Sequence, residues 1–81
     1  MEIDINTKIE RWRAKAELFL KENIKCIIKT IDGSLHSADI LLVDLNYLHI
    51  YDFVKKEKFR VYWLDVLLFE EWKDKGVKNN E

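Results

Sequence analysis

The chain has few of the residues on which several classes of protein depend. Its single cysteine, Cys26, excludes an intrachain disulfide, and its place in an apolar run is typical of a buried thiol in a reducing, intracellular compartment. The two glycines leave little material for a phosphate-binding loop, and no P-loop, dinucleotide-binding or nucleophile-elbow motif occurs. No apolar run approaches membrane-spanning length, and the N-terminus carries Glu2 and Asp4 instead of a basic targeting segment. We therefore expect a soluble, cytoplasmic protein.

The chain also lacks an excess of either charge. With 14 Lys and Arg against 15 Asp and Glu, its formal net charge is -1, so any contact with nucleic acid must be local. Metal-capable side chains occur without the paired spacing of a metal site; they are Cys26, His36, Asp44 and His49. A chain this short rarely encloses a pocket that separates the pKa values of two carboxylates. We expect no cofactor, no metal and no enzymatic activity.

What is present indicates one folded domain. The 81 residues are 48% hydrophobic and 12% aromatic, which excludes disorder of the whole chain. At this size a single core is only marginally sufficient, so self-association is an option. Residues 1–72 are expected to form the domain, and residues 73–81, with almost no apolar content, a flexible C-terminal tail.

The first part of the domain has the pattern of an amphipathic helix. Thr7 and Glu10 match a capping box, which predicts that the helix begins here, and Asn23 is suited to end it in a left-handed conformation. Apolar residues recur at three- and four-residue spacing at Ile9, Trp12, Ala16 and Phe19. The outward side is expected to carry Lys8, Arg11, Lys15 and Glu22. One face of this helix therefore requires a covering surface.

From residue 24 the composition turns β-branched and short strands are expected. Asp32-Gly33 predicts a hairpin with a type I′ turn, because both central positions of that turn need positive φ. The expected strands cover residues 24–31, 35–43, 47–54 and 59–63. The run from residue 64 is either a fifth strand, which we favour, or one turn followed by a helix. The pattern predicts a mainly β fold, an N-terminal helix followed by a five-stranded, strongly bent antiparallel barrel of SH3-like type.

One stretch is similar to a known family. Gly33 is the turn glycine, Ile40 is an apolar position in the second expected strand, and Asp44 is the aspartate before the third. With the preceding helix, these positions resemble the first motif of the Sm-like (LSm/Hfq) family, over roughly residues 7–69. The family's second glycine falls on Ala38, and the basic residue of its second motif is missing near Trp63.

The resemblance implies a ring of subunits that binds single-stranded RNA through barrel loops facing a pore. In this chain Asp44 and Asn46 would contact a base edge, and Tyr47 or Trp63 would stack on the base, with Tyr51 and Tyr62 as further candidates for stacking. Either Arg60 or the loop with Lys55, Lys56 and Lys58 would meet a phosphate. The alternative interpretation of these aromatic residues is that they belong to the core or to a subunit interface.

The last two strands are expected to present long apolar edges. In a monomer such edges would be exposed to aggregation, so a partner is expected. The residues assigned to this interface between subunits are Val61, Trp63, Val66 and Leu68. The alternative function is a protein–protein interaction or assembly module with the same barrel and no nucleic-acid binding.

Overall fold

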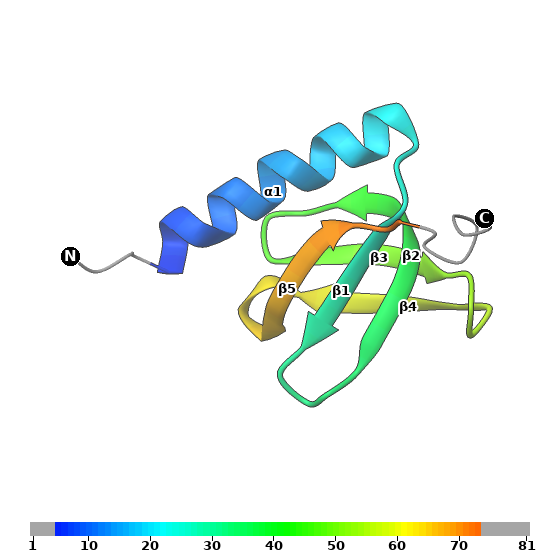
Figure 1. The fold of residues 1–81 in the computed structure, drawn as a ribbon. Coiled ribbons are helices and arrows are strands. Elements are labelled where there is room, and N and C mark those ends of the chain that lie inside the picture. Colours follow the sequence, from blue (N-terminus) through cyan, green and yellow to red (C-terminus); the bar gives the residue numbers. More distant parts are fainter. Residues whose placement is uncertain (1–4, 74–81) are drawn as a thin grey trace.

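The computed structural model describes residues 5–73, with side chains from residue 6 (Figure 1). Its elements are α1 (Ile5–Glu22), β1 (Cys26–Thr30), β2 (Leu35–Val43), β3 (Tyr47–Asp52), β4 (Glu57–Tyr62), the 3-10 helix η1 (Trp63–Asp65) and β5 (Val66–Glu71). The fold is mainly β, as expected, with one N-terminal helix and a five-stranded antiparallel sheet that is not closed into a barrel. The expected tail, except for Lys73, lies outside the described residues.

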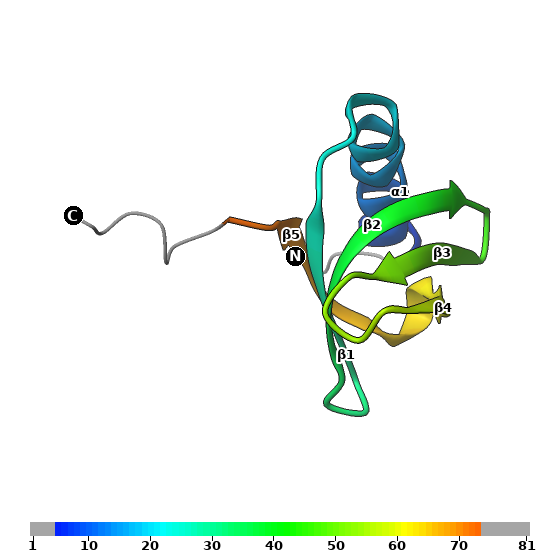
Figure 2. The same ribbon diagram turned by 90° about the vertical axis from the view of Figure 1, so that its right-hand side faces the viewer.

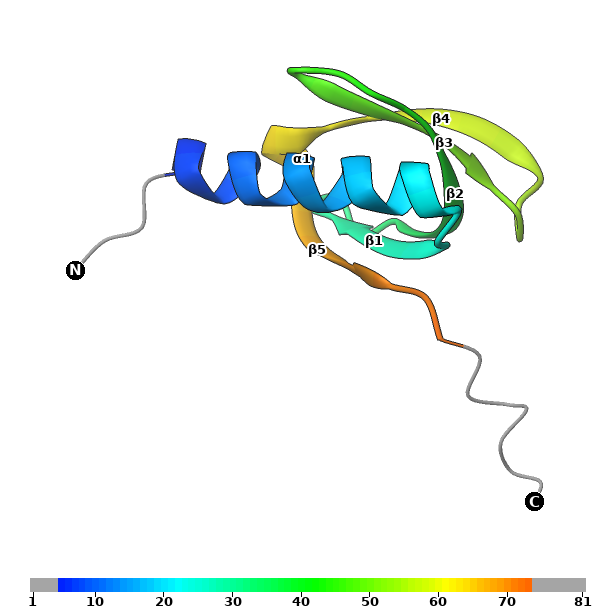
Figure 3. The same cartoon turned by 90° about the horizontal axis from the view of Figure 1, so that it is seen from above.

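The sheet has the strand order β4-β3-β2-β1-β5, so the last strand returns to lie beside the first. It is strongly curled, because irregularities in register interrupt both the β2–β3 and the β1–β5 ladders and such bulges increase local bending. Figure 2 shows β2 and β3 curving away from the plane of β1, and Figure 3 shows α1 lying between β3–β4 on one side and β1–β5 on the other. The helix thus covers the open mouth of the sheet, and β4 and β5 are its two edges.

The helix begins earlier than the capping-box pattern predicts. α1 already includes Ile5, so Thr7 lies inside the helix and cannot be its N-cap, and that part of the prediction is wrong. Residues three apart share one helix face, so a Thr-x-x-Glu spacing also arises within a helix and does not by itself mark the start.

The end of the helix follows the prediction. Asn23 has a φ of 58°, and the Ile24 backbone N–H donates to the Phe19 carbonyl at 2.9 Å. This Schellman arrangement satisfies a carbonyl group that has no partner within the helix, and an asparagine adopts the left-handed conformation at modest cost. The chain then turns directly into β1.

The first hairpin is confirmed, but its turn differs from type I′. Only Gly33 has a positive φ, at 91°, and Asp32 is not in the left-handed region. The Gly33 N–H donates to the Thr30 carbonyl and the Thr30 N–H to the Ser34 carbonyl, both at 3.0 Å, which gives a three-residue loop. The Asp32 carboxylate accepts from the Ser34 N–H at 3.0 Å and from the Thr30 hydroxyl at 2.5 Å. These side-chain bonds stabilise the longer loop.

The core lies between the concave face of the sheet and α1. Ala16 and Phe19 are buried, and Ile9 and Trp12 pack against the core from the same helix face. The buried apolar residues of the sheet and of η1 are Cys26, Ile28, Ala38, Ile40, Leu48, Ile50, Val61, Trp63, Val66 and Phe69. Lys15, expected to point outward, instead folds over the sheet and donates to the Phe69 carbonyl at 2.9 Å. Within the part of the chain that the structure describes, no helix has the length and apolar character needed to cross a membrane.

The ambiguous run after residue 63 contains a single 3-10 turn followed by a strand. η1 reverses the chain, and β5 pairs with β1 over the register from Cys26↔Glu71 to Thr30↔Val66. The preference for a fifth strand is confirmed. The alternative, one turn followed by a helix, is wrong for residues 66–71, which form this strand.

Candidate nucleic-acid interface

The outer face of β3 and β4 carries a row of aromatic and basic side chains. The register pairs Tyr47 with Tyr62, His49 with Arg60, and Tyr51 with Lys58. Between them, Leu48 and Ile50 point to the opposite face and are buried, because successive residues of a strand alternate between its two faces. The alternation therefore brings aromatic rings and cations from two strands onto one exposed surface.

Four of these side chains contact one another, and we call them the aromatic patch: Tyr47, His49, Arg60 and Tyr62. The Arg60 guanidinium lies 4.4 Å from the centre of the Tyr47 ring. The Tyr47 ring lies 5.9 Å from the Tyr62 ring, edge-on, and 5.5 Å from the His49 ring. A hydrogen bond with the Tyr62 side chain is the main cause that raises the pKa of Arg60. Electrostatic attraction to Tyr47, Tyr62 and Asp44 raises this pKa further by smaller amounts. Arg60 is therefore a permanent cation held over an aromatic ring.

The loop between β2 and β3 lies beside the aromatic patch. The Asp44 N–H donates to the Tyr47 carbonyl at 2.9 Å, and the Trp63 N–H donates to the Asn46 carbonyl at 3.1 Å. Asn46 is exposed and Asp44 is half-buried. The structure therefore brings together four of the five residues expected from the sequence to contact nucleic acid, namely Asp44, Asn46, Tyr47 and Arg60.

The fifth, Trp63, is placed differently from its expected role. Its side chain is only 1% exposed, packs edge-on against Phe69 at 6.1 Å, and donates its indole N–H to the Asp44 carbonyl at 3.0 Å. A ring that is enclosed on both sides has no face for a base. Trp63 instead holds the Asp44 loop in position from inside the core.

Two other residues assigned to a subunit interface are also core residues. Val61 and Val66 are buried, because they lie on the concave face of the curled sheet, while Leu68 is half-buried. The assignment of Val61, Trp63 and Val66 to an exposed edge is therefore wrong. The large apolar side chains exposed in this region are Tyr62, Leu64 and Leu67.

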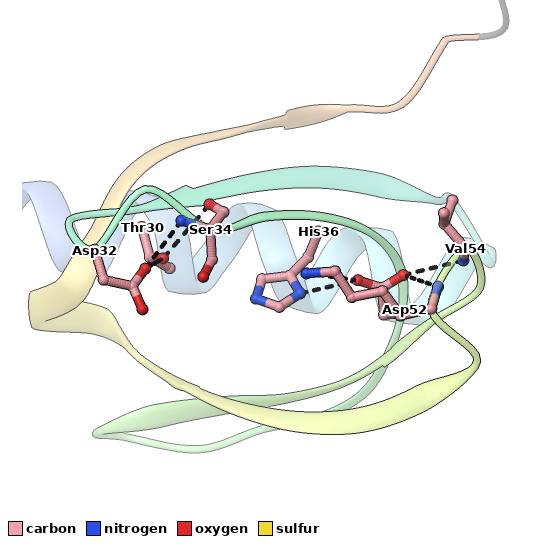
Figure 4. Close-up of polar contacts among 7 residues, drawn as sticks. Thr30, Asp32, Ser34, His36, Asp52 and Val54 are labelled. Carbon is pink, nitrogen blue, oxygen red and sulfur yellow. Dashed lines mark hydrogen bonds and ion pairs between the residues drawn. The ribbon is translucent and has the colours of Figure 1, made fainter.

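A buried hydrogen bond between a histidine and a carboxylate lies behind β4. His36 is 5% exposed and Asp52 is fully buried, and the His36 Nδ1 is 2.9 Å from the Asp52 Oδ2 (Figure 4). The other carboxylate oxygen, Oδ1, accepts from the backbone N–H groups of Val54 at 3.0 Å and Lys55 at 2.8 Å. Burial alone would raise the pKa of Asp52, but these hydrogen bonds and the one with His36 outweigh it and hold the pKa below its ordinary value. Asp52 thus links β2 to the β3–β4 turn.

A groove of about 410 Å³ opens between the β1–β2 hairpin and β4. His36 and Phe59 lie in its wall, and their rings are 4.7 Å apart. Arg60 and Tyr62 also line this groove, so it is continuous with the aromatic patch. We call it the His36 groove.

Sequence reasoning assigned no role to one member of the aromatic patch, His49, and it did not pair His36 with Asp52. The alternation of Tyr47, His49 and Tyr51 was a usable signal for the outer face. Among residues 5–73, no group of three or more His, Cys, Asp or Glu side chains is arranged to hold a metal ion. No protein-family model matches the chain, and no significant match is found among the curated proteins.

Proposed function

We propose that this chain is a non-enzymatic, Sm-like module that assembles with further copies of itself and binds single-stranded RNA. The observation that carries the proposal is the Arg60 guanidinium on the Tyr47 ring at 4.4 Å, with Tyr62 and His49 beside it on an exposed face. Proteins bind single strands by stacking bases on aromatic or guanidinium planes and by placing cations near the phosphates. The aromatic patch supplies both.

The distribution of charge supports a single strand over a duplex. The net charge of -1 provides no field for wrapping a duplex, so affinity must come from local contacts. Arg60 and Lys58 are both exposed on the outer face of β4, two residues apart on the same side. We place the phosphates along these two cations and the bases against Tyr47 and Tyr62, with Asn46 available for a base edge.

Within the mainly β class, the specific fold that we favour is the Sm-like barrel. Its support is the strand order in which β5 returns beside β1, the strong curl of the sheet, and a helix over its open mouth. The sheet leaves two unpaired edges, β4 and β5, and exposed edges of this kind attract further strands. β4 carries Lys58 and Arg60 against one acidic residue, Glu57, whereas the charged residues of β5 are Glu70 and Glu71, and this difference in charge favours pairing of β4 with β5 of the next copy.

RNA binding is tested by fluorescence anisotropy with labelled oligo-U and oligo-A. We expect Tyr47→Ala and Arg60→Ala each to weaken binding by about tenfold, since loss of a stacked base costs roughly 1–3 kcal/mol. Arg11→Ala is the matched control, because it removes an exposed arginine of α1 that does not belong to the aromatic patch. Affinity that is unchanged in both patch variants would contradict the proposal.

The second candidate is a protein–protein interaction module without nucleic-acid binding. It is favoured by Leu45 and Leu64, which are 65% and 70% exposed and flank a groove of about 530 Å³ between α1 and η1. Native mass spectrometry with and without the RNA oligomers separates the two. An assembly whose mass never changes with RNA, and which is disrupted by Leu64→Glu, would favour the second candidate.

A further inference from the structure

The His36 groove offers a hydrogen-bond acceptor from a buried side chain. The Asp52 carboxylate is ionised and can only accept, so the His36 Nδ1 must carry the proton that lies between them. In the neutral ring the second nitrogen, Nε2, is then an acceptor. Figure 4 shows Nε2 pointing away from Asp52, toward the end of the groove where Ser34 and Asp32 lie. Among the described residues, the hydrogen bond of the His36 side chain uses Nδ1 alone.

The remaining polar lining also favours a ligand that donates. Asp32 and Asp65 contribute carboxylates to the groove, on the hairpin and on η1. One oxygen of Asp32 accepts from Thr30 and Ser34, and these bonds hold its pKa at about 2, so it is negative at neutral pH. At the end of the groove where these two carboxylates lie, a hydroxyl group can donate to them or to His36 without bringing a further negative charge, while the two cations of the lining, Lys55 and Arg60, lie at the β4 wall.

The position of the groove connects it with the aromatic patch. Arg60 and Tyr62 belong to the aromatic patch and also line the groove, at its β4 wall. A strand whose bases stack on the patch therefore passes the mouth of the groove with its sugar–phosphate backbone alongside. Lys55, which lies 5.5 Å from the Phe59 ring, provides a cation at the same wall for a neighbouring phosphate.

We propose that the His36 groove binds a ribose of the RNA, and that the 2′-hydroxyl donates its hydrogen bond to the Nε2 atom of His36. This assignment rests on the proposed RNA-binding function and deepens it, since the 2′-hydroxyl is the group that distinguishes RNA from DNA. The groove makes the module selective for ribose, while the aromatic patch, which contacts bases and phosphates, binds both nucleic acids.

The first experiment uses the wild-type chain and three forms of the same oligoadenylate, carrying 2′-hydroxyl, 2′-deoxy or 2′-O-methyl sugars. We expect the 2′-hydroxyl form to bind about five- to tenfold more tightly than the other two, the effect of one hydrogen bond to an acceptor in the groove. The 2′-O-methyl sugar can accept but not donate, so it tests the direction of the bond. Two further oligomers carry a single deoxynucleotide, one at the 3′ end and one at an internal position, to separate binding of a terminal ribose from binding of an internal one. Loss of affinity at either position supports the proposal.

Two variants of His36 separate its role in the groove from its role in the fold. In His36→Asn the amide nitrogen occupies the place of Nδ1 and still donates to Asp52, while nothing replaces Nε2. In His36→Gln the amide reaches the place of Nε2, and the link to Asp52 is lost. We expect His36→Asn to melt near wild type and lose the preference for ribose, and His36→Gln to melt lower and retain part of it.

The outcomes distinguish the two proposals. Equal affinity of the wild type for the three sugars, or a full preference for ribose in His36→Asn, would refute ribose recognition and leave RNA binding by the aromatic patch standing. Binding of none of the oligomers would refute the proposed function as well.

Discussion

Removal of the Asp52 side chain should destabilise the fold strongly, because this carboxylate is fully buried and accepts hydrogen bonds from β2 and from the β3–β4 turn. Asp52→Ala leaves three donors without their acceptor: the His36 Nδ1–H and the backbone N–H groups of Val54 and Lys55. The two backbone groups lie in an exposed turn and can be hydrated, so each should cost about 1 kcal/mol or less, whereas the buried ring should cost about 1–3 kcal/mol. The sum is about 3 kcal/mol, which is typical of breaking a buried pair by removing one partner.

This loss is large for a domain of this size. A change of 1 kcal/mol shifts the Tm of a 60–100-residue domain by about 4–8 °C, so the Tm of Asp52→Ala should fall by about 12–24 °C. Circular dichroism melts and urea unfolding followed by tryptophan fluorescence measure it. Asp52→Asn is the matched control, since its amide oxygen still accepts from the turn and its amide nitrogen can donate to the other tautomer of His36.

The same carboxylate makes stability depend on pH. Its pKa in the folded state lies below the ordinary value of 3.8, so its contribution is fully present above that value. The contribution is lost as the pH falls through the folded-state pKa. The Tm difference between wild type and Asp52→Ala should therefore shrink in acid. A Tm of Asp52→Ala within about 4 °C of wild type at neutral pH would refute the reasoning.

Further predictions concern other parts of the fold. The pKa of Asp32, measured by NMR titration, should be about 2, below its ordinary value of 3.8. Its contribution to stability is therefore present above pH 3.8 and is lost as the pH falls through about 2. Thr30→Val removes one of the hydrogen bonds to the carboxylate and should raise this pKa. Trp63→Phe should lower the free energy of unfolding by about 1 kcal/mol, because the indole N–H no longer binds the Asp44 carbonyl, and a wild-type urea midpoint would contradict this. Burial raises the pKa of Cys26 to about 12, so thiol reagents should modify it only as fast as the domain unfolds, and rapid labelling of the native protein would count against its burial.

The elements were predictable because their signals are local. The sequence pattern predicts β2 at its observed bounds, residues 35–43, since turn residues flank it on both sides. The run after residue 63 could not be decided from local pattern, because its strand conformation depends on pairing with β1, which is distant in the sequence. The helix start failed because a side-chain spacing that occurs at caps also occurs inside helices.

The sequence allowed several residues of the candidate site to be predicted, but it did not allow their contacts with one another to be predicted. Tyr47 and Arg60 were both expected to contact nucleic acid, but their contact with each other and with Tyr62 depends on the register of β3 against β4. The error over Trp63 came from treating an edge strand as exposed on both faces. The alternation of Lys58 and Arg60 with Val61 and Trp63 indicates which face is buried, and it was the more informative signal.

The position of β1 at the centre of the sheet, between β2 and β5, has a consequence for synthesis of the chain. β1 is made early, yet its second neighbour, β5, is the last of the described strands to be translated. Until β5 emerges from the ribosome, one side of β1 has unpaired backbone groups and an incomplete apolar face, since Phe69 is absent from its place opposite Ile28. Pairing between segments so far apart closes a long loop and is slow. The unfinished nascent chain is therefore the state in which this protein most needs protection by a chaperone.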